Sequence, residues 1–364
     1  MLKKNNSRVP VRKFSRLLSL GGMTAGIVGN VFYSASKKYL SGERPELKDL
    51  LLTQPNVIRF SRKLLQMRGA ALKVGQLLSL ESGDFLPPEL SDILSELRNN
   101  AEAMPIEQVR EVLVSSWGKN YMKDFEMFEE MPVAAASIGQ VHKCKLKDGK
   151  VLAVKIQYPG IKESIDSDMD SLGFLLEKSG VVPDSFNLSE LIRAGREQLY
   201  TETSYISEAR FLDSFSQLLV HDENFSVPQV EKNYTSEKIL AMEFKAGVTV
   251  DKIDPADQTT KDKVIHNIFD LFFRELLQFN LVQTDPNYAN FLFNENTKKI
   301  ILLDFGATVS VSPEISFKFK KLFLETMRSN KKESEEALVD LGILDGNLPK
   351  LLVTKLMDLY WEEM

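Results

Sequence analysis

Residues 133–157, VAAASIGQVHKCKLKDGKVLAVKIQ, constrain the fold of this 364-residue chain more than any other stretch. They match a nucleotide-binding β-hairpin in which G-x-G-x-x-G-x-V precedes V-A-I-K, and Lys155 stands in the place of the motif's lysine. Alanine replaces the first two glycines, and the third is retained. The sequence therefore predicts an alanine-rich nucleotide-binding loop. Its candidate nucleotide contacts are Ala134, Ala135, Ala136, Ser137 and Gly139.

Two further motifs follow in the order expected of a phosphoryl-transfer site. Asp285 and Asn290, in QTDPNYAN, are five residues apart as in a catalytic loop, and Asp304 begins an Asp-Phe-Gly triplet after the apolar run IILL. Phosphoryl transfer needs a lysine on the phosphates, a glutamate that holds this lysine, and Mg²⁺ ligands. We therefore predict an ATP site with Lys155 on the phosphates, Asp285 as a catalytic residue, and Asn290 and Asp304 as Mg²⁺ ligands.

The amino-acid composition limits which metals and partners the chain can bind. A single cysteine excludes an intrachain disulfide, and three dispersed histidines argue against a zinc site. The net charge of −5 gives no support for nucleic-acid binding, so nucleic acid is not an expected partner. Any metal should therefore be a hard cation held by oxygen ligands.

Departures from the protein-kinase pattern concern the substrate. Gln283-Thr284 replaces the His-Arg pair that precedes the catalytic aspartate in protein kinases. Ser312-Pro313-Glu314 is the nearest match to Ala-Pro-Glu and lies too close to the Asp-Phe-Gly triplet to bound a peptide-docking segment. A protein substrate is therefore disfavoured.

The order of predicted elements indicates an α+β fold, namely an atypical protein-kinase-like bilobal fold with an N-terminal helical extension. Helices are expected at about 55–80, 89–99, 105–116, 160–215 (interrupted at 180–184) and 260–278. Strands are expected at 131–133, 140–146, 150–157, 226–231 and 238–245, with Lys147-Asp148-Gly149 as a hairpin turn. Two short strands are expected between 280 and 311.

These elements suggest four regions. Residues 1–42 form a basic segment, 43–130 a helical extension, 131–245 an N-lobe with a helical insertion, and 246–364 a C-lobe. The strand that ends in Met242-Glu243-Phe244 is the predicted hinge, where Glu243 and Phe244 would contact adenine.

Two glutamates are candidate partners of the phosphate lysine. Glu202 and Glu208 lie in a stretch that we predict to be one helix from 188 to 215. Six residues correspond to about 600° of rotation, so the two side chains would point about 120° apart. They cannot easily serve one lysine, and a second buried cation is expected. Lys73, in LKVGQ, is the candidate, although a solvated lysine on an amphipathic helix is the alternative.

The N-terminal segment is strongly basic. It carries eight Lys and Arg residues and no acid before Glu43, and residues 17–36 form an uncharged run of 20 residues. That length can just span a bilayer as a helix. A Gly-rich soluble helix, a cleaved signal and an organelle transit peptide remain open. Anionic membrane lipids are expected partners.

Several of these motifs together resemble the UbiB family of atypical kinases. Lys73-Val74-Gly75-Gln76 is similar to the family's KxGQ signature, residues 134–139 to its alanine-rich loop, and QTDPNYANF to its catalytic loop. The resemblance runs from about residue 8 to 340. It implies an ATP-binding protein with ATPase activity that supports ubiquinone biosynthesis and associates with the mitochondrial inner membrane or the bacterial cytoplasmic membrane.

The resemblance also assigns partners. It implies that Lys73 pairs with Glu202, the first residue of the family's ExD motif, and that Lys155 pairs with Glu208. The sequence departs from this motif at Ser204, which stands where the family has aspartate. Quinone-biosynthesis intermediates or enzymes are implied partners, and a homodimer is left open.

Alanine in the loop lacks the positive-φ freedom of glycine. We therefore expect the nucleotide to bind in an altered pose, with protein phosphorylation suppressed by the alanine-rich loop and the KxGQ helix. A small-molecule kinase is one alternative function. A nucleotide-gated scaffold, or a lipid-extraction factor for quinone-biosynthetic enzymes without kinase turnover, is another.

Overall fold

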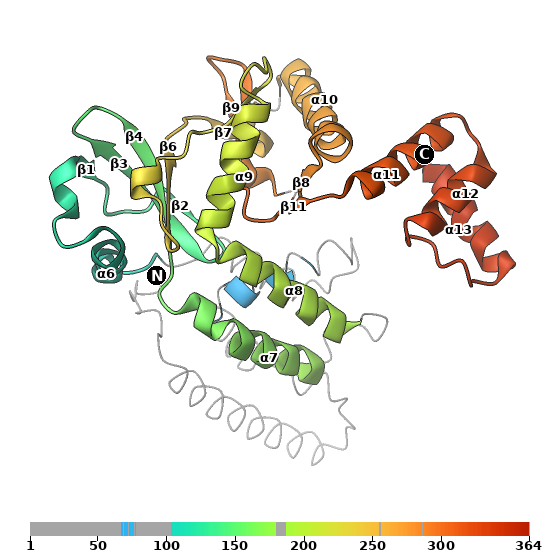
Figure 1. Cartoon of the computed structure of the whole chain (residues 1–364), viewed down its shortest axis with the longest axis horizontal. Coiled ribbons are helices and arrows are strands. Elements are labelled where there is room, and N and C mark those ends of the chain that lie inside the picture. Colours follow the sequence, from blue (N-terminus) through green and yellow to red (C-terminus); the bar gives the residue numbers. More distant parts are fainter. Residues whose placement is uncertain are drawn as a thin grey trace, which may run out of the picture. The chain divides into compact units, whose positions relative to one another are not determined.

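The computed structural model describes residues 67, 69–71, 73–75, 77, 103–179, 187–254, 256–285 and 287–363 (Figure 1). These residues fall into two units. Unit 1 contains the residues up to Asp213 together with Pro228–Lys245, and unit 2 contains Ser214–Val227 and the residues from Ala246 onward. The predicted basic segment 1–42, the predicted helix 89–99 and most of the predicted helix 55–80 lie outside the described residues.

Unit 1 is built on an antiparallel sheet in the order β1-β3-β4-β6, with β2 paired to β3. Its strands are β1 (Phe125–Phe128), β2 (Ala134–Ala135), β3 (Gly139–Leu146), β4 (Val151–Gln157) and β6 (Ile239–Glu243). The β3–β4 register places Lys145 opposite Val151. Gly149 in the connecting turn has a φ of 93°, which glycine adopts without strain. The predicted hairpin is confirmed.

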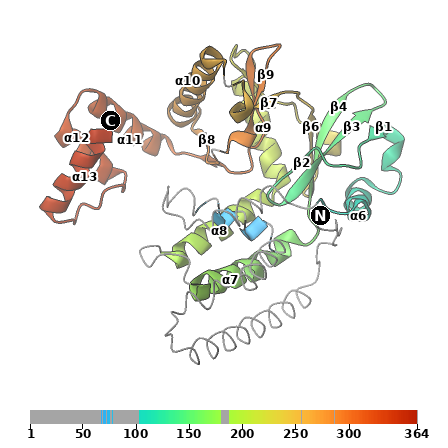
Figure 2. The same cartoon turned by 180° about the vertical axis from the view of Figure 1, so that it is seen from behind.

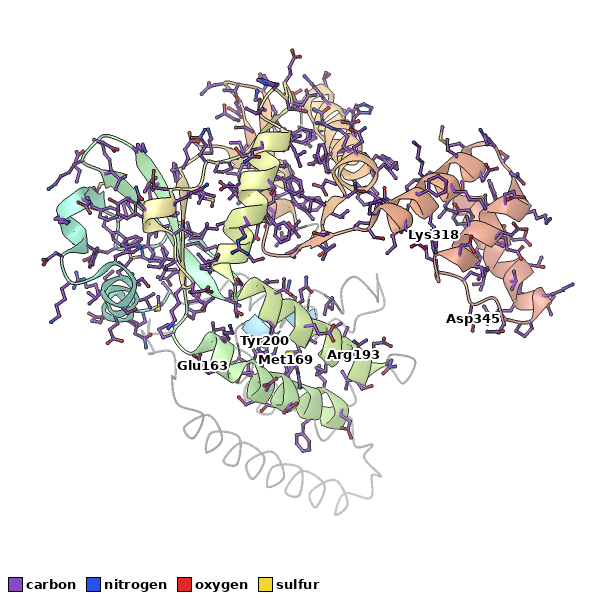
Figure 3. All side chains as sticks on the ribbon, in the orientation of Figure 1. Glu163, Met169, Arg193, Tyr200, Lys318 and Asp345 are labelled. Atoms are coloured by element: carbon purple, nitrogen blue, oxygen red, sulfur yellow. The ribbon has the colours of Figure 1, made fainter. Side chains whose placement is uncertain are left out.

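Among the residues described from 103 onward, four helices complete unit 1, and the last of them continues into unit 2. They are α6 (Ile106–Trp117), α7 (Ile161–Ser179), α8 (Leu188–Glu202) and α9 (Tyr205–Leu218). In Figures 1 and 2, α7 and α8 lie side by side. Tyr200 of α8 donates a hydrogen bond to Asp166 of α7 over 2.8 Å, and Met169 of α7 is fully buried (Figure 3). The predicted helix at 105–116 is confirmed as α6.

Two sequence predictions in unit 1 are wrong. Residues 131–133 are not a strand, and Met131 and Val133 are exposed. The strand lies earlier, as β1, which the prediction missed because four residues are too few to establish alternation. The predicted helix 188–215 is two helices, because α8 ends at Glu202 and α9 begins at Tyr205. Rotation about one axis therefore does not apply to Glu202 and Glu208.

The strand predicted at 226–231 is also wrong. Only Phe225–Ser226 (β5) forms a strand there, and Val230 makes an isolated bridge to Met242. Beyond residue 280 the structure has four short strands where two were predicted. They are β8 (Leu281–Gln283), β9 (Phe291–Asn294), β10 (Lys299–Leu302) and β11 (Thr308–Ser310).

Unit 2 combines a small sheet, a two-stranded ribbon and helices. The sheet has the order β5-β10-β9-β7, where β7 is Val248–Thr249, and β8 pairs antiparallel with β11. Helix α10 (Gln258–Arg274) continues into a π-helical turn, Glu275–Phe279. The helices α11 (Pro313–Met327), α12 (Lys331–Asp340) and α13 (Lys350–Glu363) share a separate hydrophobic cluster that includes Leu322, Leu338 and Met357.

Candidate active site

Strand β4 presents two polar side chains on one face. Successive side chains of a strand point to opposite faces, so Lys155 and Gln157 share a face while Val154 and Ile156 enter the hydrophobic core. Lys155 Nζ donates to the two carboxylate oxygens of Glu208 over 2.8 and 3.1 Å, and both residues are buried. Gln157 Nε2 donates to the carbonyl oxygen of Thr203 over 3.1 Å. This face of β4 therefore holds both the start of α9 and the end of α8.

Tyr205 is a site residue that the sequence reasoning missed. Its ring centroid lies 5.3 Å from Lys155 Nζ, within the range of a cation–π contact, and the residue is fully buried. A Cβ at Gly139 would lie 2.8 Å from the Tyr205 hydroxyl and 2.4 Å from the carbonyl oxygen of Ile156. The one retained glycine of the loop is therefore required by packing. The sequence did offer a signal for Tyr205, because residues three apart on a helix are neighbours and Tyr205 stands three before Glu208.

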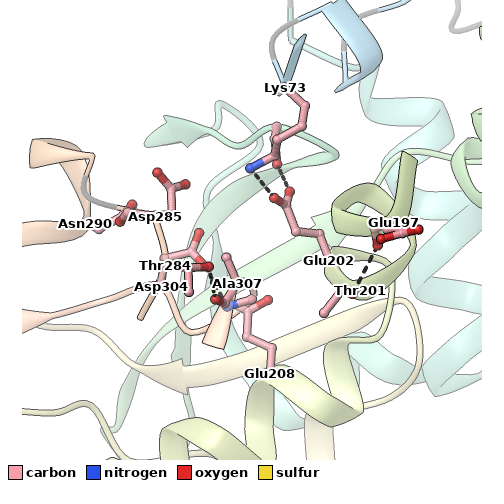
Figure 4. Close-up of polar contacts among 12 residues, drawn as sticks. Lys73, Glu197, Thr201, Glu202, Glu208, Thr284, Asp285, Asn290, Asp304 and Ala307 are labelled. Carbon is pink, nitrogen blue, oxygen red and sulfur yellow. Dashed lines mark hydrogen bonds and ion pairs between the residues drawn. The ribbon is translucent and has the colours of Figure 1, made fainter. Parts of the chain in front are cut away.

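A second lysine–glutamate pair lies in the same unit. Lys73 Nζ is 2.5 Å from Glu202 Oε1, and the Lys73 side chain is only 2% exposed. Figure 4 shows Lys73 directed at the Glu202 carboxylate. Ser137 of the alanine-rich loop donates its hydroxyl to Glu202 Oε2 over 2.6 Å. One carboxylate thus binds the KxGQ lysine with one oxygen and the nucleotide loop with the other.

The KxGQ segment, defined here as residues 67–77, is helical at 69–71, 73–75 and 77. A Cβ at Gly69 would lie 3.2 Å from the carbonyl oxygen of Ser137, so this segment packs directly on the alanine-rich loop. On the other side, a Cβ at Gly195 of α8 would lie 3.4 Å from Val74 Cγ2. Seven residues are about two helical turns, so Gly195 and Glu202 lie on one face of α8. Because Gly195 packs against Val74, the same face of α8 places Glu202 beside Lys73.

Ser204 occupies the break between α8 and α9. Its hydroxyl accepts a hydrogen bond from the backbone N–H of Ser207 over 3.3 Å, which is the geometry of a helix N-cap. Aspartate and serine are both good N-cap residues. Ser204, which stands where the family has aspartate, therefore caps α9 in this structure.

The alanine-rich loop is extended rather than coiled. Ala134 and Ala135 form β2 and pair with Val141 and Gln140, and the N–H of Ala136 donates to the carbonyl oxygen of Gly139 over 2.9 Å. Ala134 and Ala135 are exposed. Their methyl groups are therefore accessible to a bound molecule.

The candidate metal ligands lie in unit 2. The N–H of Leu303 donates to the carbonyl oxygen of Asn290 over 3.0 Å, so Asp304 and Asn290 flank the same end of the β9–β10 hairpin. Asn290 Nδ2 donates to the carbonyl oxygen of Asp285 over 3.3 Å, which holds the catalytic loop closed on itself. Asp304 Oδ1 accepts from the N–H of Gly306 over 2.9 Å. These carboxylate and amide oxygens are a donor set that suits Mg²⁺.

No group of three or more His, Cys, Asp or Glu side chains in the described part of the chain could hold a metal ion by itself. A cation held by Asn290 and Asp304 would therefore need further oxygens, and nucleotide phosphates supply them. The residues present thus fit Mg²⁺ bound together with ATP.

Thr284 was missed as a site residue. Its hydroxyl and its N–H donate to the carbonyl oxygen of Ala307, over 2.6 and 3.2 Å (Figure 4). Ala307 directly follows the Asp-Phe-Gly triplet, so the chain itself ties the catalytic loop to that segment. Arginine at this position in protein kinases belongs to the His-Arg-Asp motif, and threonine here makes a direct backbone contact instead.

The predicted hinge residues end strand β6. The N–H groups of Glu243 and Phe244 donate within unit 1, to the carbonyl oxygens of Gln229 and Val151 over 2.8 and 2.9 Å. These two N–H groups are therefore engaged by the chain. Contact of Glu243 and Phe244 with adenine stays a prediction.

Comparison with known proteins gives a consistent assignment. Residues 96–338 match the ABC1 atypical kinase-like domain. The chain is 41% identical over 341 residues to "Atypical kinase COQ8, mitochondrial" of Saccharomyces cerevisiae, covering 94% of this chain and 68% of that protein. It is 36% identical over 345 residues to the protein of the same name from Schizosaccharomyces pombe, covering 94% of this chain and 56% of that protein. These relatives are longer than the region that they share with the chain.

A solved structure is also similar. The complex of Rv3197 with erythromycin from Mycobacterium tuberculosis has a TM-score of 0.56 and 25% sequence identity, covering 82% of this chain and 76% of that chain. The predicted α+β, kinase-like fold is confirmed. Among the described helices, none has both the length and the hydrophobicity to cross a bilayer, and the candidate run at 17–36 lies outside the described residues.

Proposed function

The chain belongs to the ABC1 atypical kinase-like family, and from this membership we propose that it binds MgATP and transfers the terminal phosphate. The relatives named as atypical kinases support this assignment, as the resemblance to the UbiB family predicted. The observation that carries the proposal is the buried ion pair between Lys155 and Glu208. Phosphoryl transfer requires such a lysine, held by a glutamate and directed at the phosphates.

In unit 1, the proposed role of Lys155 is to neutralise charge on the phosphates. Glu208 and the ring of Tyr205 fix its position, since both contact Nζ. The loop from Ala134 to Gly139 would cover the phosphates, with Ala135 as an exposed contact. Glu202 and Ser137 would restrain this loop, which supports suppressed phosphorylation of proteins.

In unit 2, the proposed role of Asp285 is to orient the phosphate acceptor and accept its proton. Asn290 and Asp304 would hold Mg²⁺. Mg²⁺ held there would supply positive charge that stabilises the negative charge of the phosphates during transfer. The hydrogen bonds from Thr284 to Ala307 keep the strand that leads to Asp285 in place.

The acceptor is proposed to be water or a small molecule. The pathway is proposed to be ubiquinone biosynthesis, which the COQ8 relatives and the UbiB resemblance support. Residues 1–42 are proposed to bind anionic lipids of a mitochondrial or bacterial membrane. The helical extension 43–130, the N-lobe 131–245 and the C-lobe 246–364 remain a proposed division of the chain.

The test is product analysis with MgATP. The full chain is incubated with MgATP alone, with a phenolic quinone precursor, and with anionic vesicles, and free phosphate and phosphorylated precursor are measured. We expect free phosphate or phosphorylated precursor from the wild type and at least about tenfold less from Lys155→Met. Lys145→Met is the control, because Lys145 is on β3 and pairs with Glu126 at the surface over 2.8 Å. Nucleotide binding without either product would favour a nucleotide-gated scaffold.

A further inference from the structure

Helix α10 does not end in the ordinary way. After Arg274 the chain forms the π-helical turn Glu275–Phe279, which Asn280 closes in the left-handed conformation with a φ of 53°. The N–H of Asn280 donates to the carbonyl oxygen of Glu275. π-Helical turns are rare and often occur at functional sites. This turn directly precedes the strand that leads to the catalytic loop.

Glu275, the first residue of the turn, places a carboxyl group inside unit 2. It is 4% exposed, and its Oε2 accepts a hydrogen bond from the backbone N–H of Gln283 over 3.0 Å. Gln283 is the last residue of β8 and stands two residues before Asp285. It is also paired with Thr308 of β11. The carboxyl of Glu275 therefore fixes the backbone where β8 becomes the catalytic loop.

Thr284, the next residue, is bonded to a different segment of unit 2. Thr284 donates from its hydroxyl and its N–H to the carbonyl oxygen of Ala307. Successive residues before Asp285 are thus anchored to α10 through Glu275 and to the segment after Asp-Phe-Gly through Thr284. Two anchors on neighbouring residues fix both the position and the direction of the chain that enters Asp285.

The surroundings of Glu275 favour a neutral carboxyl. Burial raises the pKa of Glu275 to about 8, and the hydrogen bond from the N–H of Gln283 opposes that shift. Strand β8 carries no charged residue. The adjoining Arg274 is paired with Asp222 and Asp270. The other charged or titratable residues of α10 stand nine or more positions before Glu275, and they are Lys261, Asp262, Lys263 and His266. On α11, Lys318 pairs with Glu314, Lys321 with Glu333 and Glu325 with Arg328, and the remaining charged residue is Lys320.

We propose that Glu275 is a positioning residue for Asp285, acting through the backbone of Gln283. Its neutral carboxyl accepts the Gln283 N–H and sets the geometry of the catalytic loop. That this geometry matters for turnover rests on the proposed function. That Glu275 anchors the loop is independent of the proposed function.

Two substitutions separate the hydrogen bond from the carboxyl group. Glu275→Gln keeps an acceptor oxygen of similar shape and cannot ionise. Glu275→Ala removes the acceptor and leaves the Gln283 N–H without this partner. Thr326→Val is the control, because Thr326 of α11 is buried and hydrogen-bonded to Tyr360 over 2.6 Å, within the C-terminal helices.

The first measurement is hydrogen exchange of backbone amides in peptides that contain residues 281–290. Glu275→Ala should raise exchange there while peptides from unit 1 keep theirs, and Glu275→Gln should restore protection. Thr326→Val should leave exchange at 281–290 unchanged. Wild-type protection of 281–290 in Glu275→Ala would overturn the proposal whether or not the protein turns over ATP.

The second measurement is MgATP turnover as a function of pH. Glu275→Ala should lower kcat by about 10- to 100-fold with a much smaller change in KM, because the loop is misplaced and phosphate binding is not. An ionised Glu275 would still accept the Gln283 N–H, but its charge would be buried, so ionisation above a pH of about 8 should draw the carboxylate toward solvent and loosen the turn. Wild-type turnover should therefore fall there, and Glu275→Gln should lack this fall. Equal pH profiles for the wild type and Glu275→Gln, or unchanged kcat in Glu275→Ala, would overturn the proposal. A wild type that lacks turnover contradicts the proposed function alone.

Discussion

The Nζ of Lys73 lies 2.5 Å from Oε1 of Glu202, in an ion pair that is almost fully buried. The other oxygen of the carboxylate accepts from Ser137. The KxGQ segment and the nucleotide loop are therefore bound to the same side chain. A movement of the KxGQ segment would shift Glu202, and a shift of Glu202 would move the nucleotide loop.

Loss of one partner from this pair should be strongly destabilising. Lys73→Met leaves the Glu202 charge buried without its cation, and we expect a loss of roughly 3–5 kcal/mol in the free energy of unfolding. The double variant Lys73→Met/Glu202→Gln removes both charges and should recover most of that loss. The measurement is urea-induced unfolding.

The control for this prediction is an exposed pair. Lys150 lies 3.0 Å from Glu231, and its side chain is 60% exposed. Lys150→Met should lower the free energy of unfolding far less than Lys73→Met does, because exposed ion pairs contribute little to stability. A Lys73→Met variant no less stable than Lys150→Met would contradict the buried pair.

Loss of the hydrogen bond that joins the nucleotide loop to Glu202 should change the activity of the protein more than its stability. Ser137→Ala removes the hydrogen bond to Glu202 and should cost about 1 kcal/mol of stability. Because the loop is then less restrained, we expect more autophosphorylation than in the wild type. The measurement is incorporation of labelled γ-phosphate into the protein.

A matched serine tests whether this effect is specific. Ser171 of α7 donates to the carbonyl oxygen of Ser167 over 2.6 Å, within one helix of the same unit. Ser171→Ala should therefore leave labelling at the wild-type level. If Ser137→Ala and Ser171→Ala give equal labelling, Ser137 does not restrain the loop.

The parts of the fold that the sequence predicted correctly are those whose signals lie within one short stretch of the chain. The β3–β4 hairpin was predictable because alternation and the turn at Gly149 lie within 20 or so residues. The division between α8 and α9 was missed because no glycine or proline marks it. That break depends on the cap at Ser204 and on the hydrogen bond from Gln157 to Thr203, which joins residues 46 apart.

The residues of the candidate site were also indicated by local signals, and their roles stay predictions. Residue types and spacing indicated Lys155, Asp285 and Asp304, because phosphoryl transfer demands particular charges in a particular order. The anchors of Glu275 on Gln283 and of Thr284 on Ala307 join segments through backbone atoms. Backbone acceptors and donors carry no residue-specific signal, so such contacts cannot be inferred from one sequence.

The buried carboxyl of Glu275 should make folding stability depend on pH. Its pKa in the folded protein, about 8, lies above its ordinary value of 4.5. The folded state therefore holds the proton more tightly than the unfolded state, and stability falls as pH rises between these values. The thermal midpoint of the wild type should drop relative to Glu275→Gln between about pH 5 and 8.5. A constant difference between the two midpoints would show that Glu275 has no raised pKa.

Binding of MgATP through Asp304 can be measured by isothermal titration calorimetry of the full chain with ATP, with and without Mg²⁺. The wild type should bind ATP more tightly with Mg²⁺, and Asp304→Asn should lose at least about tenfold in affinity for MgATP, or about 1.4 kcal/mol. Asp345→Asn is the control, because Asp345 is exposed and caps a turn at Asn347 near the C-terminus. Equal MgATP affinity in the wild type and in a folded Asp304→Asn variant would show that Asp304 does not bind the metal.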